Sequence, residues 1–124
     1  MQNSSNSPSN FGSSRIERRA APRYSFLALV EATDAAGVMC IQGRLRDISS
    51  KGCYVHTPST FAAGTALEVI ISREGETFRS HSKVVYEHAG IGMGLVFADA
   101  ANDQLETLNS WLVRLASTDM LERN

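Results

Sequence analysis

Apolar and β-branched residues recur along the chain in short runs, and turn-forming residues separate these runs. Runs of this length, with Gly, Pro, Asp or Ser between them, are typical of β-strands joined by tight turns. The alternation within the runs is imperfect, so it does not decide which face of each strand is buried. The runs that we expect to form strands are 24–32, 38–45, 52–57, 66–72, 77–87 and 93–97.

The last part of the chain has a helical pattern. Leu105, Leu108, Leu112 and Leu115 recur at intervals of three and four residues, and Trp111 widens the apolar stripe that they form. We expect this helix to cover an open side or mouth of the β-structure. An alternative is that the helix moves, or offers a surface to a partner, after a ligand binds.

Short strands at regular spacing, followed by one helix, predict an all-β domain with a C-terminal helix. The strands would form a small antiparallel barrel of about six strands, or a sandwich. The length of 124 residues fits one domain. We expect a disordered tail over the Ser- and Asn-rich residues 1–14, the β-barrel domain with its N-terminal arm and C-terminal helix over 15–117, and a frayed tail over 118–124.

The overall charge and the apolar content exclude several classes of protein. A formal net charge of −1 argues against a general polyanion binder, so nucleotide binding would need a local basic patch. No apolar run approaches the roughly 20 residues that a membrane helix needs, and the N-terminus does not resemble a signal peptide.

Cys40 and Cys53 lie in apolar runs without metal-ligand spacing. We expect both to be buried, reduced thiols in a cytoplasmic protein.

Three arginines lie close together just before the first expected strand. Arg18, Arg19 and Arg23 fall within six residues, on a segment that contains Pro22 and has no helical or strand periodicity. A guanidinium is planar, always charged, and donates hydrogen bonds in pairs, which suits phosphate groups and the O6/N7 edge of guanine. Taken alone, the segment could equally be a solvated linker.

A polar turn at residues 47–52 carries a second set of candidate groups. The carboxylate of Asp47 can accept from N–H donors on a base, Ser49 offers a hydroxyl to phosphate, and Gly52 lets the backbone approach a ligand closely. Taken alone, these residues could form an ordinary turn in which Asp caps backbone N–H groups.

Together these two segments resemble the PilZ family of cyclic di-GMP receptors. Residues 19–23 fit the family pattern R-x-x-x-R, and residues 47–52 fit D/N-x-S-x-x-G without departure. Residues 92–97 resemble the late G-x-G-x-x-F strand of the family, and the whole resemblance extends from about residue 15 to residue 116. It implies a split-barrel PilZ-like fold and a bacterial second-messenger receptor.

The resemblance also implies roles for individual residues. Arg19 and Arg23 would contact guanine and phosphate, and Asp47 would accept from a guanine edge. Ser49 would donate to phosphate or brace the arginine arm, and Gly52 would clear space and set the turn. Cyclic di-GMP would be the ligand, without any further cofactor.

The charge of the arm implies a mechanism, and the resemblance implies a stoichiometry. The arm at residues 15–23 would be mobile without ligand and would close over the barrel when a dianionic ligand binds, which could expose or hide a surface for a downstream protein. Arg18 precedes the motif, and in the family an arginine there goes with a stacked pair of ligands. We therefore expect two molecules of cyclic di-GMP per chain, although Arg18 could also be simply solvated.

Other functions fit the sequence less well. The histidines show no metal-ligand spacing, and no nucleophile or paired carboxylates indicate catalysis, so we expect no enzyme activity. A protein-interaction module on the same scaffold, with weak or no nucleotide binding, is the main alternative. Binding of single-stranded nucleic acid would need a charged groove with several exposed aromatic residues, and few aromatics accompany the arginines here.

Overall fold

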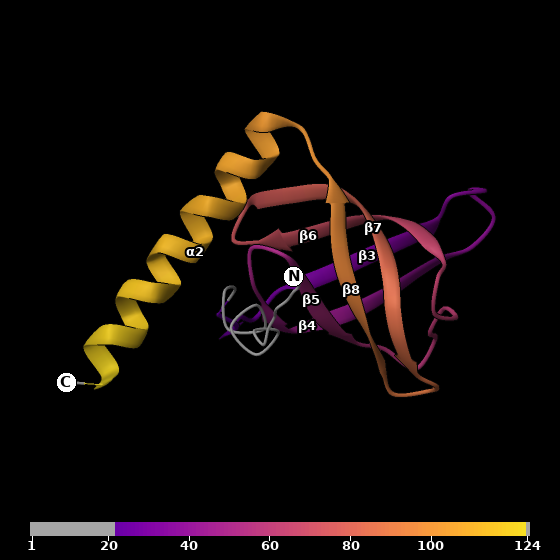
Figure 1. Ribbon diagram of the computed structural model, residues 1–124, viewed down its shortest axis with the longest axis horizontal. Coiled ribbons are helices and arrows are strands. Elements are labelled where there is room, and N and C mark those ends of the chain that lie inside the picture. Colours follow the sequence, from indigo (N-terminus) through magenta and orange to yellow (C-terminus); the bar gives the residue numbers. More distant parts are fainter. Residues whose placement is uncertain (1–21, 124) are drawn as a thin grey trace, which may run out of the picture.

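The computed structural model describes residues 22–123, including the side chains of residues 22–118. It consists of seven strands and one long helix, arranged as a barrel with the helix against one end (Figure 1). The elements are β2 Tyr24–Ser25, β3 Leu29–Asp34, β4 Cys40–Ile48, β5 Gly52–His56, β6 Ala66–Arg73, β7 Glu76–His88, β8 Gly92–Asp99 and α2 Asn102–Arg123.

Six of the strands close into an antiparallel barrel. The strand order is β2-β4-β3-β6-β7-β8-β5, and an additional pairing of β4 with β5 closes the ring. Closure removes the unpaired strand edges that an open sheet would expose. The short strand β2 pairs only with the end of β4, where Ser25 lies opposite Asp47. The predicted barrel is therefore confirmed, and the sandwich is excluded.

The barrel interior is filled by every second residue of its strands. Val30 and Ala32 of β3 and Val69 and Ile71 of β6 are buried, while the residues between them are exposed or half-buried. This alternation is the strand periodicity of two, with the apolar face turned inward. The inward face that the sequence left undecided is thus the one that carries Val30.

Helix α2 is attached to the barrel by a few buried side chains. Leu108 and Trp111 are buried, and the ring of Trp111 lies 5.0 Å from that of Phe26, measured between centroids. The indole Nε1 of Trp111 also donates to Oε1 of Glu76, at 2.9 Å. Leu105, which we expected on the same stripe, is 40% exposed. The prediction that the helix covers the barrel is confirmed, and in Figure 1 its C-terminal half extends away from the strands.

Some boundaries differ from those expected. The run 24–32 forms two strands because the ladder is interrupted between Ser25 and Leu29, although buried and exposed residues still alternate there. Strand β4 continues to Ile48, so the turn begins at Ser49 and not at Asp47. Helix α2 extends to Arg123, beyond the boundary expected at residue 117, and no Gly or Pro interrupts it.

The two cysteines lie in different environments. Cys53 is fully buried, and burial raises the pKa of its thiol to about 12, so it stays protonated at neutral pH. Cys40 is exposed at the start of β4, so the expectation that it would be buried was wrong: its side chain occupies an outward position of the strand. Both are free thiols.

Candidate functional site

Asp47 lies at the centre of a cluster of charged groups on the barrel surface. Its Oδ1 accepts a hydrogen bond from Nε of Arg23, at 2.9 Å, and its Oδ2 accepts one from Nε of Arg46, at 3.1 Å. The Asp47 side chain is only 16% exposed, whereas those of Arg23 and Arg46 are 45% and 53% exposed. Strand β2 brings Arg23 to this place, because its pairing with β4 puts Ser25 opposite Asp47.

Both arginines contact Asp47 through Nε, which leaves their terminal nitrogens available. Within residues 22–123, the terminal nitrogens of Arg23 and Arg46 make no hydrogen bond. These nitrogens form the paired donors that match a phosphate or the O6/N7 edge of guanine. A carboxylate with one bond to each oxygen can also still accept from a base. The cluster can therefore bind an anion and a purine edge together.

The turn after Asp47 is stabilised by Ser49. The Ser49 hydroxyl accepts from the backbone N–H groups of Lys51 and Gly52, at 3.1 and 3.2 Å, and lies 3.3 Å from the Gly52 carbonyl oxygen, to which it donates. Ser49 is fully buried. In this structure Ser49 fixes the shape of the turn, and its contact with a phosphate stays a prediction.

Gly52 allows two strands to pack closely beside the turn. A Cβ atom at Gly52 would lie 2.0 Å from the carbonyl oxygen of Leu95 on β8, far inside van der Waals contact. Any side chain there would push β5 and β8 apart. Gly52 thus holds the turn against the barrel, which is compatible with the expected role of setting the turn.

A group of aromatic rings adjoins the charged cluster on the outer barrel surface. We call Tyr54, Tyr86 and His88 the aromatic shelf; their ring centroids lie 5.3–6.0 Å apart. The Tyr54 hydroxyl is 2.8 Å from Nδ1 of His88. A Cβ atom at Gly92 would lie 2.6 Å from that hydroxyl, and one at Gly94 would lie 2.4 Å from the Tyr86 ring. The two tyrosine rings therefore lie directly on the bare backbone of β8.

Sequence reasoning missed Arg46 and the aromatic shelf. The guanidinium carbon of Arg46 lies 4.2 Å from the centroid of the Tyr54 ring, in a cation–π contact. Arg46 lies just before the D/N-x-S-x-x-G motif and is not part of it, so the motif did not indicate it. The spacing of Gly92 and Gly94 was the available signal, because a strand face without side chains must be covered by its neighbours.

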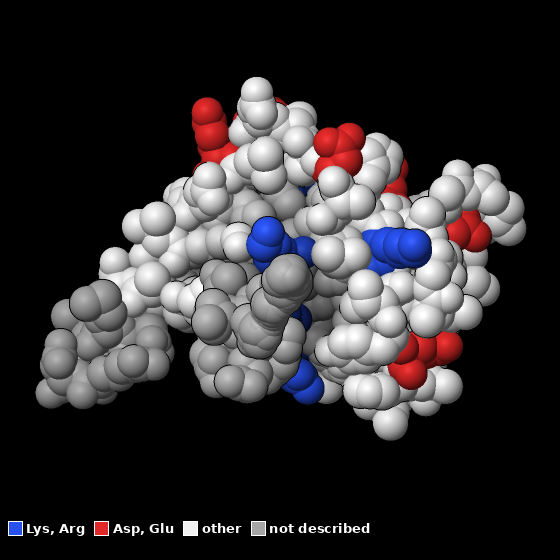
Figure 2. Space-filling model, viewed as in Figure 1, with Lys and Arg blue, Asp and Glu red and all other residues white. Residues whose placement is uncertain are grey.

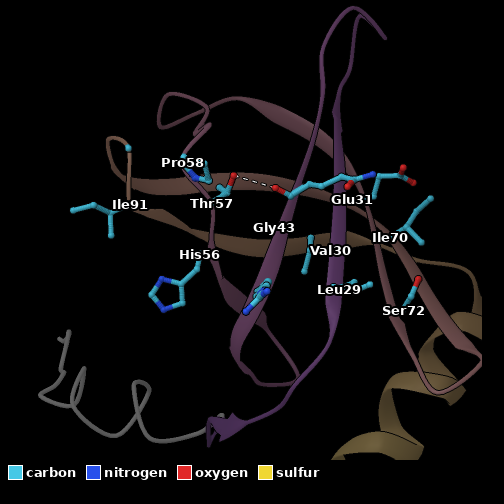
Figure 3. A pocket seen from close by; sticks show the side chains of 13 residues that line it. Leu29, Val30, Glu31, Gly43, His56, Thr57, Pro58, Ile70, Ser72 and Ile91 are labelled. Carbon is cyan, nitrogen blue, oxygen red and sulfur yellow. Dashed lines mark hydrogen bonds between the residues drawn. The ribbon is translucent and has the colours of Figure 1, made fainter.

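A groove of about 720 Å³ lies beside this cluster, between β3 and β6 on one side and β5 with the β7–β8 turn on the other (Figure 3). Arg44 and His56, which pair across β4 and β5, line it together with Leu29, Ile70 and Ile91. Figure 2 shows basic side chains gathered in the middle of one face, with acidic side chains nearer its edges. The lining of the groove is therefore partly apolar and partly basic.

The structure brings together only part of the predicted site. Arg23, Asp47 and the turn that contains Ser49 and Gly52 lie side by side. Arg18 and Arg19 lie outside the described residues, as does the expected disordered tail. In the part of the chain that the structure describes, no three His, Cys, Asp or Glu side chains are grouped to hold a metal ion, and no helix is long and apolar enough to cross a membrane.

The fold is shared with solved structures, of which three are compared below. The PilZ domain of CeSA from a cellulose-synthesizing bacterium is 20% identical, with a TM-score of 0.60 over 77% of this chain and 98% of that one. The inhibitor of motility MotI/DgrA of Bacillus subtilis is 19% identical, with a TM-score of 0.67; the match covers 86% of this chain but only 53% of MotI. The PilZ domain of Escherichia coli YcgR, solved with cyclic di-GMP, is 12% identical, with a TM-score of 0.65 over 86% and 97%.

The sequence itself places the chain in a family. No curated protein matches it closely enough in sequence to assign a function. The sequence model of the PilZ domain, however, matches residues 17–114, which include the arginine segment, the whole barrel and most of the helix. Because this match covers most of the chain, the protein belongs to the PilZ domain family.

Proposed function

We propose that this protein is a cyclic di-GMP receptor that signals to a partner protein. PilZ domains are regulatory modules that bind cyclic di-GMP and act on partner proteins, and the PilZ domain of YcgR was solved with this ligand. The observation that carries the proposal is the cluster at Asp47, where Arg23 and Arg46 each donate through Nε and, among residues 22–123, leave their terminal nitrogens without an acceptor. Such a cluster matches a ligand with two phosphates and two guanines.

Each motif residue has a role in this proposal. Arg23, together with Arg19 from the preceding arm, contacts guanine and phosphate. Asp47 orients Arg23 and accepts from the edge of a guanine. Ser49 holds the turn that follows Asp47 and, as the motif implies, would donate to a phosphate. Gly52 keeps this turn against β8.

Ligand binding would change the arm at residues 15–23. Its charge is strongly positive, with four arginines and one glutamate, so the arginines repel one another without an anion. Cyclic di-GMP would neutralise them and draw the arm onto the barrel, and the altered surface would be recognised by a cytoplasmic partner protein. The protein would act without catalysis, as a receptor and adaptor.

Calorimetric titration with cyclic di-GMP tests this proposal. We expect Arg19→Ala and Arg23→Ala each to weaken binding about tenfold to a hundredfold, because each removes a charge-assisted contact of roughly 1–3 kcal/mol. Arg79→Ala is the matched control, since Arg79 is exposed and pairs with Glu68 on a different part of the barrel. Deleting residues 1–23 should abolish binding and leave the barrel folded. Unchanged affinity in the truncated protein would exclude the arm mechanism.

The same titration measures the number of ligands. If Arg18 supports a stacked pair of cyclic di-GMP molecules, saturation will occur at two ligands per chain, and Arg18→Leu will reduce this to one. A single ligand bound by fully active wild-type protein would contradict the role of Arg18. Competition with GTP and with a single-stranded oligonucleotide, neither of which should displace the ligand, distinguishes the receptor from a nucleic-acid binder.

The groove supports a second candidate function, a protein-interaction module. Leu29 and Ile91 line this groove and are 65% and 62% exposed, so the groove offers apolar surface that a partner would cover on binding. A module of this kind would capture the same partner with and without cyclic di-GMP. A receptor would capture its partner only with, or only without, cyclic di-GMP. Affinity capture under both conditions therefore distinguishes the two functions.

A further inference from the structure

The side chain of Arg46 is held in place by two different contacts. Its Nε donates to Oδ2 of Asp47 at 3.1 Å, and its guanidinium carbon lies 4.2 Å above the centre of the Tyr54 ring. The hydrogen bond to Asp47 fixes the direction in which the side chain extends. The cation–π contact places the planar guanidinium against the face of the Tyr54 ring. A long, exposed arginine normally samples many rotamers, so this degree of restraint is a specific property of the site.

Tyr54 is itself a rigid support. It is 2% exposed although it lies on the outer surface of the barrel, because neighbouring groups enclose it. The backbone of β8 at Gly92 lies beneath it, the His88 ring accepts or donates at its hydroxyl at 2.8 Å, and Arg46 covers it from above. The orientation of the Arg46 guanidinium is therefore fixed by the barrel framework.

The outer surface of the Arg46 guanidinium remains open. Its side chain is 53% exposed, and its terminal nitrogens have no acceptor within residues 22–123. The carboxylate of Asp47 connects it to Arg23, so both guanidiniums lie around one acceptor. A ligand that contacts Arg23 and Asp47 would consequently lie next to the free face of Arg46.

We propose that Arg46 is a further ligand-binding residue, and that its guanidinium stacks on a guanine base of the bound cyclic dinucleotide. The inference rests on the proposed function of the same site. The base would form the third layer over Tyr54 and Arg46, because a planar cation with one face on an aromatic ring offers its other face to a second ring. Arg46 would thus determine affinity for a flat base, while Arg23 contacts the polar groups.

The experiment separates the flat shape of Arg46 from its charge. Arg46→Lys keeps one positive charge and a donor for Asp47 but lacks a planar surface. We expect it to weaken cyclic di-GMP binding in calorimetry by about fivefold to tenfold, which is the size of a cation–π contact. Arg79→Lys, on an exposed arginine paired with Glu68, is the matched control and should bind like wild type.

Variants of the supporting ring test the same stack from below. Tyr54→Phe keeps the ring and loses only the contact with His88, so its affinity should stay within about twofold of wild type. Tyr54→Leu removes the ring and should weaken binding about as much as Arg46→Lys. The double variant Arg46→Lys/Tyr54→Leu should be no weaker than either single variant, because both remove one shared interaction. Thermal melting shows that each variant is folded at the titration temperature.

Two results would overturn the inference, and they are distinguishable. If wild-type protein binds cyclic di-GMP and Arg46→Lys binds equally well, the guanidinium does not stack on the base, while the proposed function stands. If wild-type protein fails to bind at millimolar ligand, the proposed function is wrong and the inference is lost with it.

Discussion

Two carboxylates on this barrel each hold two nitrogen donors, yet they serve different purposes. Asp47 accepts from Arg23 and Arg46, one on each oxygen. Glu76, at the start of β7, accepts from Trp111 and Arg114 of helix α2, both on Oε1 at 2.9 and 3.0 Å. The chemistry is similar, because in both places a carboxylate restrains long or bulky side chains, at least one of which comes from another segment.

The two clusters differ in how many N–H groups of the donor side chains remain without a hydrogen bond. The Nε of Arg114 donates to the Ser110 carbonyl oxygen, and one terminal nitrogen is shared between Glu76 and the Ser110 hydroxyl. Trp111 has only one donor, and it is used. Within residues 22–123, by contrast, the terminal nitrogens of Arg23 and Arg46 have no acceptor. An arginine cluster is therefore a candidate binding site when its paired donors remain unsatisfied, and a structural contact when they do not.

The largest effect that should distinguish the two regions is on stability. Trp111→Ala removes a buried indole and its contacts with Phe26 and Glu76, which we expect to lower the free energy of unfolding by roughly 3–5 kcal/mol. Chemical denaturation measures this loss, and Trp111→Phe should lose less. Variants that remain folded should keep their affinity for cyclic di-GMP. A large loss of affinity would mean that the two regions are coupled.

An intermediate effect should appear in ligand binding alone. Asp47→Asn removes the charge that orients Arg23 and Arg46 but keeps the shape of the side chain. We expect cyclic di-GMP affinity to fall about tenfold, since charge-assisted contacts of roughly 1.5 kcal/mol are weakened. The midpoint of denaturation should move little, because the two arginine partners are 45% and 53% exposed, and ion pairs with such solvent-screened groups contribute little to stability. A variant that unfolds easily would show that Asp47 contributes mainly to stability.

The smallest effect concerns the pH dependence of stability. Hydrogen bonds from Trp111, and then from Arg114, lower the pKa of Glu76 below its ordinary value of 4.5. A carboxyl group with a lowered folded-state pKa stabilises the protein above that range and loses this contribution as pH falls through the folded pKa. Glu76→Gln should therefore melt slightly below wild type at pH 7. The difference should shrink below pH 4.5, and a constant difference would exclude the charge as its source.

The barrel was predictable because turn residues divide the sequence into strands. Runs such as 66–72 and 77–87 lie within one or two residues of β6 and β7, since the charged turn at Glu74 and Gly75 separates them clearly. The break between β2 and β3 was not predictable. Residues there keep the alternation of a strand, and only tertiary contacts, such as the bond from Arg73 to the Leu27 carbonyl oxygen, reveal that they leave the ladder.

The motif residues of the site were predictable from the sequence, and the residues around them were not. The sequence indicates that Arg23 and Asp47 belong to one ligand site, because the two motifs occur in order, and in the structure Nε of Arg23 lies 2.9 Å from Oδ1 of Asp47. It gave no reason to choose Arg46, because an arginine beside an aspartate is common. Its importance depends on the Tyr54 ring, which reaches it from another strand across a register shift between β4 and β5.

The position of Trp111 makes it an intrinsic fluorescent probe of the segment around Arg23. It is the only tryptophan in the chain, and its ring touches Phe26, three residues after Arg23. Indole emission depends on the polarity and motion of nearby groups, so a displacement of the segment around Arg23 would be transmitted to the fluorophore through one aromatic contact. Movement of the arm could thus be followed in real time by intrinsic fluorescence, without attaching a label.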